Sequence, residues 1–249
     1  NMLEVIMEIK EEERIDDLDN EGLKIIQKKN GFCFGMDSIL LSNFAKGMKK
    51  NAILLDLGSG TGILSILLSK RSECKKIYAV EIQQEMAEMI NRSIKMNHLE
   101  EKICVINEDI RNLLTHFEKQ SVDVIVTNPP YKKIKTGIVN ENKNKLVSRH
   151  EIEGNLEDFI NITYQLLKDH GELYMVHRPE RLADIIELLR RYKIEPKNIR
   201  FVYPRIDRGS NLLLIRAVKN GKEFLKIEEP LIIYKENGEY TEELIEIYK

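Results

Sequence analysis

Short apolar segments of strand length alternate with helical segments through the middle of the chain. Residues 52–58 (AILLDLG) predict a buried strand, and residues 63–71 (ILSILLSKR) predict the helix that follows it. Such alternation is typical of an α/β fold in which a doubly wound, mostly parallel sheet carries helices on both faces. No helix separates the last two strands, so we expect them to pair as an antiparallel hairpin. Further strands are expected at 76–82, 102–107, 122–128, 172–177, 198–204 and 211–218, and further helices at about 84–96, 111–117, 156–167 and 180–192.

Two flanking segments extend this pattern. Residues 37–44 predict a short helix whose N-terminus Asp37 can cap, and Asn237-Gly238 fits a tight hairpin turn. We therefore expect a core at residues 49–220, an N-terminal extension at 2–48 that packs on it, and a C-terminal hairpin and helix extension at 221–249.

The composition excludes several classes of protein. Of the 249 residues 42% are apolar, which is enough for a sizeable core and rules out global disorder. The 39 Lys and Arg residues against 41 Asp and Glu residues give a net charge of −2. The protein therefore does not bind nucleic acid through a large overall positive charge. No apolar run approaches the roughly 18 residues of a membrane span, and no signal peptide is visible. Three widely spaced cysteines fit neither a disulfide framework nor a zinc site. We expect a cytoplasmic protein without a bound metal, present as a monomer or weak dimer.

A glycine-rich loop joins the first strand to its helix. The segment Asp56-Leu57-Gly58-Ser59-Gly60-Thr61-Gly62 allows backbone conformations that are closed to other residues and lets a ligand approach the main chain. Its G-x-G-x-G spacing differs from the G-x-G-x-x-G fingerprint of dinucleotide sites, and it lacks the Lys-Ser/Thr of a phosphate-binding loop. A ligand with phosphates is therefore not favoured. Taken alone, such a loop could also be only a tight turn.

Two carboxylates follow the next two strands. Glu81, at the end of the second strand, can accept hydrogen bonds from the vicinal hydroxyls of a ribose, and Asp109, after the third, can accept from an adenine amino group. Each could also be an ordinary surface acid. In this order behind the glycine loop they describe an adenosine without phosphates, which favours S-adenosylmethionine (SAM) as the ligand.

The fourth strand ends in Asn128-Pro129-Pro130-Tyr131, called the NPPY segment below. Its two prolines fix the backbone and remove two N–H donors, so that carbonyl oxygens can point away from the sheet. The Asn128 side-chain oxygen and the Pro129 carbonyl could then hold the two N–H bonds of a planar nitrogen in line with a sulfonium methyl group. The exocyclic amine of adenine and the amide of glutamine are such nitrogens, and Tyr131 offers a face for a flipped base. The alternative is a rigid turn that only closes the strand.

The motifs DLGSGTG and TNPPY resemble those of the N6-adenine and glutamine-N5 branch of the class I methyltransferases. More specifically, the whole chain resembles the bacterial tRNA(Val) adenine N6-methyltransferases, with matching features at 31–45, 148–151, 176–186 and 230–243. The resemblance implies a Rossmann-like α/β fold with a seven-stranded, mostly parallel sheet and an antiparallel last strand. It also implies contacts with the target amine at Asn128, Pro129, Pro130 and Tyr131, and SAM contacts at Asp56, Gly58, Ser59, Gly60, Gly62, Glu81, Ile82, Asp109, Ile110 and Asn128.

A basic segment follows the NPPY segment. Residues 132–149 carry six Lys and Arg residues against the single acid Glu141. A charge run of this kind is often only a solvated loop, but here it begins where the substrate must enter. Basic side chains at that place can neutralise RNA phosphates without reading bases. We expect substrate contacts at Tyr131, Lys132, Lys133, Lys135, Arg149 and Arg178.

The sequence leaves the acceptor molecule open. We favour RNA, because we see neither the target-recognition domain of DNA methyltransferases nor the helical N-terminal module of release-factor methyltransferases. The resemblance to the tRNA(Val) enzymes implies that this RNA is tRNA and that the target adenine lies near the anticodon. The same chemistry on ribosomal RNA, DNA or a protein glutamine remains an alternative. So does a non-catalytic module that binds SAM or RNA.

Overall fold

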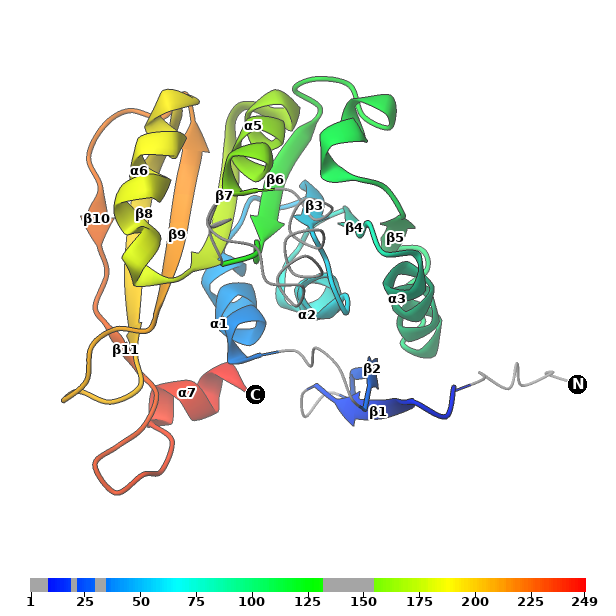
Figure 1. Cartoon of the computed structure of the whole chain (residues 1–249), viewed down its shortest axis with the longest axis horizontal. Coiled ribbons are helices and arrows are strands. Elements are labelled where there is room, and N and C mark those ends of the chain that lie inside the picture. Colours follow the sequence, from blue (N-terminus) through cyan, green and yellow to red (C-terminus); the bar gives the residue numbers. More distant parts are fainter. Residues whose placement is uncertain (1–8, 19–21, 30–34, 132–154) are drawn as a thin grey trace, which may run out of the picture.

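The computed structural model describes residues 9–18, 22–29, 35–131 and 155–249, and one twisted sheet forms its centre (Figure 1). Seven strands follow one another across it in the order β5-β4-β3-β6-β7-β9-β8. β9 runs antiparallel to its neighbours β7 and β8, and the other pairs in this order are parallel. The seven strands are β3 (Ile53–Leu57), β4 (Lys76–Val80), β5 (Ile103–Ile106), β6 (Val122–Thr127), β7 (Leu167–His177), β8 (Ile194–Tyr203) and β9 (Leu212–Lys219).

This arrangement confirms the Rossmann-like sheet, its antiparallel last strand and the hairpin of β8 and β9. Two short strands that the sequence analysis did not predict lie along the outer side of β8. They are β10 (Lys226–Ile227) and β11 (Leu231–Ile232), and both run parallel to β8.

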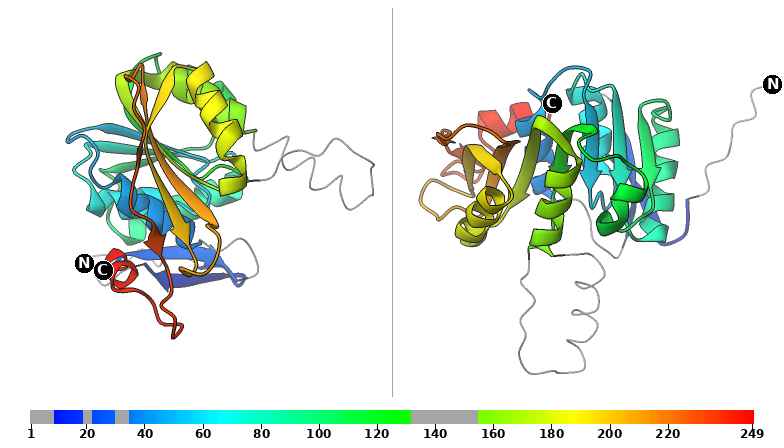
Figure 2. Two further views of the ribbon diagram at one scale, coloured as in Figure 1. Left: turned by 90° about the vertical axis from the view of Figure 1, so that its left-hand side faces the viewer. Right: turned by 90° about the horizontal axis from the view of Figure 1, so that it is seen from above.

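Helices cover both faces of the sheet (Figure 2). Alternate residues of each strand point to opposite faces, so Leu54 and Val124 enter one apolar core while Leu55 and Ile125 enter the other. The 3₁₀ turn η2 (Pro179–Arg181) leads into α6. The first core is covered by α1 (Met36–Ala45), α2 (Ile63–Arg71), α3 (Gln84–Met96) and α7 (Glu242–Ile247), and the second by η1 (Ile110–Thr115), α5 (Leu156–Leu166) and α6 (Leu182–Arg191).

The N-terminal strands β1 (Glu13–Asp17) and β2 (Lys24–Lys28) form a separate antiparallel pair against α3. The side chain of Asn97 donates to the carbonyl of Lys24 at 2.7 Å and accepts from its N–H at 2.9 Å. Ser93 accepts from the N–H of Ile26 at 3.0 Å. Side chains next to and within the last turns of α3 therefore satisfy backbone groups along the edge of β2, which no strand pattern had predicted.

The C-terminal segment folds back onto the helices of the first core. Asn237-Gly238 forms the predicted hairpin turn, with the N–H of Gly238 donating to Lys235 at 3.1 Å and a bridge between Tyr234 and Tyr240. Arg71 of α2 holds the last helix, because one of its guanidinium nitrogens donates to the carbonyl of Ile247 at 2.8 Å. The C-terminus thereby lies against α1 and α2 (Figure 1).

No helix within the described ranges combines the length and the apolar character that a bilayer crossing requires. Within the same ranges, no three His, Cys, Asp or Glu side chains are grouped so that they could bind a metal ion.

Candidate active site

The candidate residues follow the carboxyl ends of the parallel strands. The glycine loop (residues 58–62) follows β3, Glu81 follows β4, Asp109 follows β5 and the NPPY segment follows β6. β3 and β6 are neighbours, and the last residue of each, Leu57 and Thr127, are register partners. The Thr127 hydroxyl also donates to the Leu57 carbonyl at 2.9 Å. The glycine loop and the NPPY segment therefore leave the sheet side by side, at the edge where open α/β sheets bind ligands.

Left-handed backbone angles shape the glycine loop. The φ angle is +58° at Gly60 and +84° at Gly62, values that residues with a Cβ avoid. A Cβ at Gly62 would lie 2.9 Å from Ile90 of α3, whereas one at Gly60 would meet no described atom within 4 Å. Gly62 is thus packed against the protein, and Gly60 borders open space.

Glu81 ties this loop to the next strand. Its buried carboxylate accepts from the N–H of Gly60 through Oε2 and from the N–H of Gln83 through Oε1, both at 2.8 Å. The Asn107 side chain donates to the carbonyls of Glu81 at 2.8 Å and Ile82 at 3.1 Å. Each carboxylate oxygen has more than one acceptor site, so Glu81 can hold the loop and still accept from a ligand.

Asp56 lies fully buried at the end of β3. Its Oδ2 accepts from the hydroxyls of Ser59 at 2.7 Å and Ser65 at 2.8 Å. Among the described residues, neither Oδ1 of Asp56 nor the hydroxyl of Thr61 has a hydrogen-bond partner. Burial raises the pKa of Asp56 to about 6, against the opposing effect of the two serine hydroxyls. An unpaired buried acceptor is costly, so this position suits a ligand that brings a donor or a positive charge.

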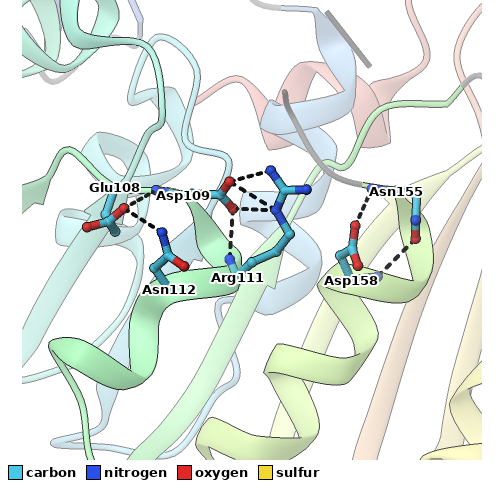
Figure 3. A network of polar contacts seen from close by, with 6 residues as sticks. All are labelled: Glu108, Asp109, Arg111, Asn112, Asn155 and Asp158. Carbon is cyan, nitrogen blue, oxygen red and sulfur yellow. Dashed lines mark hydrogen bonds and ion pairs between the residues drawn. The ribbon is translucent and has the colours of Figure 1, made fainter. Parts of the chain in front are cut away.

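Asp109 is engaged by its neighbour Arg111 (Figure 3). Both carboxylate oxygens accept from Nε of Arg111 at 2.9 Å, and Oδ1 also accepts from the Arg111 N–H at 2.9 Å and so caps η1. Burial alone would raise the pKa of Asp109, but the hydrogen bonds from Arg111 outweigh it and hold that pKa below its ordinary value. The capping box of α5, formed by Asn155 and Asp158, lies beside Arg111. A ligand that uses Asp109 must share the carboxylate with Arg111.

The NPPY segment is held by side chains of α1. The Tyr131 hydroxyl lies 2.5 Å from Oδ2 of Asp37 and 2.7 Å from Oδ1 of Asn128. The amide nitrogen of Asn128 lies 3.5 Å from the hydroxyl of Ser38. The prediction that Asp37 caps α1 is wrong, because Gly35 occupies the cap position and Asp37 lies one residue inside the helix. Its carboxylate is taken by Tyr131 instead of by the backbone of its own helix.

Two residues at the end of β7 fix the Tyr131 ring. The His177 ring lies with its centroid 5.1 Å from that of Tyr131, and the guanidinium carbon of Arg178 lies 4.9 Å from the Tyr131 centroid. Arg178 also donates to the carbonyl of Asn211 at 2.9 Å. Burial lowers the pKa of His177 to about 4, and the neighbouring charge of Arg181 acts in the same direction. His177 is therefore neutral above that pH, and its Nδ1 accepts from the Arg178 N–H at 2.8 Å.

The structure brings together most of the residues singled out in the sequence. Pro129 is buried, Pro130 and Ile82 are half-buried, and Ile110 is buried as the first residue of η1. No local pattern in the sequence points to Ser38 or His177 as site residues, and Asp37 was predicted as a helix cap. The predicted substrate contacts Lys132, Lys133, Lys135 and Arg149 lie outside the described residues.

The chain is similar in sequence and in fold to known and predicted methyltransferases. Residues 34–202, more than half of the chain, match the family described as Methyltransferase small domain. The tRNA1(Val) (adenine(37)-N6)-methyltransferase of Haemophilus influenzae strain PittEE is 28% identical over 215 residues, which cover 86% of this chain and 88% of that protein. The protein of the same name from Tolumonas auensis is 28% identical over 222 residues, covering 85% and 86%. Among solved structures, a predicted O-methyltransferase of Agrobacterium tumefaciens, Atu636, aligns with a TM-score of 0.69 at 21% identity, over 86% of this chain and 95% of that one. This last likeness shows the fold.

Proposed function

The chain belongs to the Methyltransferase small domain family and is a methyltransferase, and we propose that it transfers a methyl group from SAM to the exocyclic N6 of an adenine in tRNA. The observation that carries this proposal is the position of the glycine loop beside the NPPY segment, on the register-paired ends of β3 and β6. One motif suits the adenosine and methionine parts of SAM, and the other suits a planar acceptor nitrogen.

The residues around the glycine loop fit SAM. Glu81 would accept from the ribose hydroxyls, because its oxygens keep acceptor capacity beyond Gly60 and Gln83. Asp109 would accept from the adenine amino group while it remains bonded to Arg111. Oδ1 of Asp56 has no hydrogen-bond partner among the described residues, so it suits the methionine ammonium group, which would form a charged hydrogen bond with it.

The NPPY segment fits the acceptor amine. SAM supplies an electrophilic methyl group on a sulfonium centre. Oδ1 of Asn128 and the carbonyl of Pro129 would each accept one N–H of the adenine amine, which aims the nitrogen lone pair along the line of transfer and favours the pyramidal nitrogen of the transition state. As the new N–C bond formed, the bond between the sulfonium sulfur and the methyl group would break and S-adenosylhomocysteine would leave. No strong base is needed, because the nitrogen would lose its proton to water after the new bond had formed. The Tyr131 ring, fixed by His177 and Arg178, would carry the base by stacking.

The choice of tRNA rests on the relatives and on charge. The two curated relatives described above carry names that specify adenine 37 of tRNA1(Val) and the N6 position. We propose the same acceptor position for this chain, with phosphate contacts from the basic residues Lys132, Lys133, Lys135 and Arg149 and from Arg178 near the base.

An acceptor comparison tests this proposal. Purified protein and labelled SAM would be offered total tRNA, ribosomal RNA, duplex DNA and a release factor in parallel, and the labelled product would be identified by mass. We expect N6-methyladenosine in tRNA. Label in a different acceptor would overturn the substrate, and bound SAM without any transfer would favour a non-catalytic binding module.

A further inference from the structure

The Tyr131 hydroxyl faces two acceptors and has one proton to give. It lies 2.5 Å from a carboxylate oxygen of Asp37 and 2.7 Å from the amide oxygen of Asn128. A phenol carries a single O–H, so only one of these contacts can be a full hydrogen bond at a time. An ionised carboxylate is the stronger acceptor, and the Asp37 distance lies in the range of charge-assisted O–H to O⁻ bonds.

The acceptor to which the Tyr131 hydroxyl donates its proton decides whether Oδ1 of Asn128 is available to the target amine. If Tyr131 donates to Asn128, Oδ1 of Asn128 already has a donor when the target amine arrives. If Tyr131 donates to Asp37, Oδ1 of Asn128 lies beside a second oxygen with no hydrogen between the two. Such a pair of acceptors is stabilised by an incoming donor, and an amine N–H is one.

We propose that Asp37 is a positioning residue: it takes the Tyr131 proton and thereby leaves Oδ1 of Asn128 available to the N–H of the acceptor amine. This inference rests on the proposed function, because it assigns a role within the same amine site. Asp37 lies on α1, 94 residues before Tyr131 in the sequence.

The surroundings of Tyr131 support this division. Burial, and after it the negative charge and hydrogen bond of Asp37, raise the pKa of Tyr131 above its ordinary value, so the phenol keeps its proton. His177 and Arg178 fix the ring, which prevents the hydroxyl from turning away from both acceptors. On its other side, the amide nitrogen of Asn128 faces Ser38, so Oδ1 is the atom turned toward Tyr131.

A set of four proteins tests the role: the wild type, Asp37→Ala, Tyr131→Phe and the double variant. Tyr131→Phe keeps the aromatic face and removes the competing proton. We expect Asp37→Ala to lower kcat by about ten- to a hundredfold, because the tyrosine proton then turns to Asn128. SAM affinity by calorimetry should change less than about threefold. The double variant should be more active than Asp37→Ala, since removing the hydroxyl removes the competition.

The decisive result is the sign of this coupling. A higher kcat in the double variant than in Asp37→Ala supports the proposal. A kcat in the double variant that is lower than in Asp37→Ala, by the factor that Tyr131→Phe causes alone, overturns it. Asp37→Asn provides a variant of unchanged size in case the alanine variant is unstable, and the same rescue is expected for it. Asp169→Asn, an exposed aspartate near the start of β7, is the matched control and should leave kcat unchanged.

Two further readouts separate this proposal from the proposed function. The four proteins are compared on whichever acceptor the wild type methylates, so a different acceptor would overturn the tRNA assignment but leave the rescue testable. Equilibrium unfolding of the same four proteins reports the Asp37–Tyr131 hydrogen bond without any acceptor. Free-energy changes that are simply additive there would show that no such bond exists and would overturn the inference.

Discussion

The two halves of the candidate site are built in different ways. We call the part proposed to bind SAM the SAM half, and the part proposed to bind the acceptor amine the acceptor half. The SAM half consists of the glycine loop and the residues at the ends of adjacent strands, and Glu81 accepts a hydrogen bond from the N–H of Gly60. The acceptor half is centred on residues 128–131, but side chains from α1 and from the end of β7 hold it in place. The first half is therefore held by contacts among the segments that follow neighbouring strands, and the second depends on side chains from α1 and the end of β7. Substitutions in one half should affect binding, and substitutions in the other should affect the chemical step.

The largest effect is expected from Asn128→Ala. Loss of the amide oxygen removes an acceptor that acts on the reacting nitrogen, so kcat should fall by about 10²- to 10³-fold. SAM affinity should stay within about twofold, because in the proposal SAM depends mainly on the other half. Single-turnover methyl transfer and calorimetry on the same preparation measure the two quantities.

Asn161→Ala is the control for this variant. Asn161 is exposed on α5, and its side chain bonds only Gln165 among the contacts described, so neither quantity should change. Equal losses of SAM affinity and kcat in Asn128→Ala would break the division between the two halves.

Gly62→Ala should be the most destabilising change in the SAM half. Alanine must adopt a φ of +84° and bring its Cβ to 2.9 Å from Ile90, so we expect the free energy of unfolding to fall by about 2–4 kcal/mol. Gly60→Ala must also adopt a positive φ, but its Cβ would meet no described atom within 4 Å. We expect its free energy of unfolding to fall by about 1–2 kcal/mol. Urea unfolding distinguishes the two. Similar losses in both variants would mean that packing on α3 does not fix the loop.

Glu81→Ala should weaken SAM binding and leave kcat nearly unchanged, which is the opposite of the result expected for Asn128→Ala. It removes acceptors for the ribose and for the Gly60 N–H, so the Kd for SAM should rise by about 10- to 100-fold. At saturating SAM, kcat should fall by no more than about threefold. Glu88→Ala, an exposed change on α3, should alter neither value. A large fall in kcat with an unchanged Kd would contradict the SAM assignment.

The smallest effect is a pH dependence from Asp56. Its pKa is raised to about 6 in the folded protein, above the value of about 4 in an unfolded chain. Between these values the folded protein binds the extra proton, so Asp56 contributes less to stability as the pH rises from about 4 to about 6. Thermal unfolding of the wild type and Asp56→Asn across this range measures the contribution as a difference between the two curves.

The same carboxyl predicts how SAM binding depends on pH. If the methionine ammonium group pairs with ionised Asp56, affinity should rise about tenfold between pH 5 and pH 7. Asp56→Asn should bind more weakly and lose this dependence. A dependence of the same size in the variant would place the ammonium group elsewhere.

The sequence predicted the local structure of the SAM half better than the contacts that hold the acceptor half, and the structure gives the reason. Strand, glycine loop and helix follow one another in the sequence, and their apolar periodicity and glycine spacing are local signals. Asn128 and Tyr131 could also be singled out from the sequence, because two prolines at a strand end are a local signal. The sequence around Asp37 predicts only a helix cap, because nothing within α1 indicates that a tyrosine 94 residues away donates a hydrogen bond to its carboxylate. His177 was predicted only as the last residue of a strand, and its contact with Tyr131 arises because the sheet order places β7 beside β6. The edge of β2 was missed for the same reason, because its partners are side chains from the end of α3 and the residue that follows it.

Methyl transfer to two tRNA(Val) transcripts is the most direct test of the account. The transcripts would differ only at position 37, with adenine in one and guanine in the other, and labelled nucleosides would be identified by mass after digestion. We expect N6-methyladenosine from the adenine transcript and no label in the guanine transcript. Equal labelling of both transcripts, or label in any nucleoside other than N6-methyladenosine, would contradict the assignment of the NPPY segment to an adenine amine at that position.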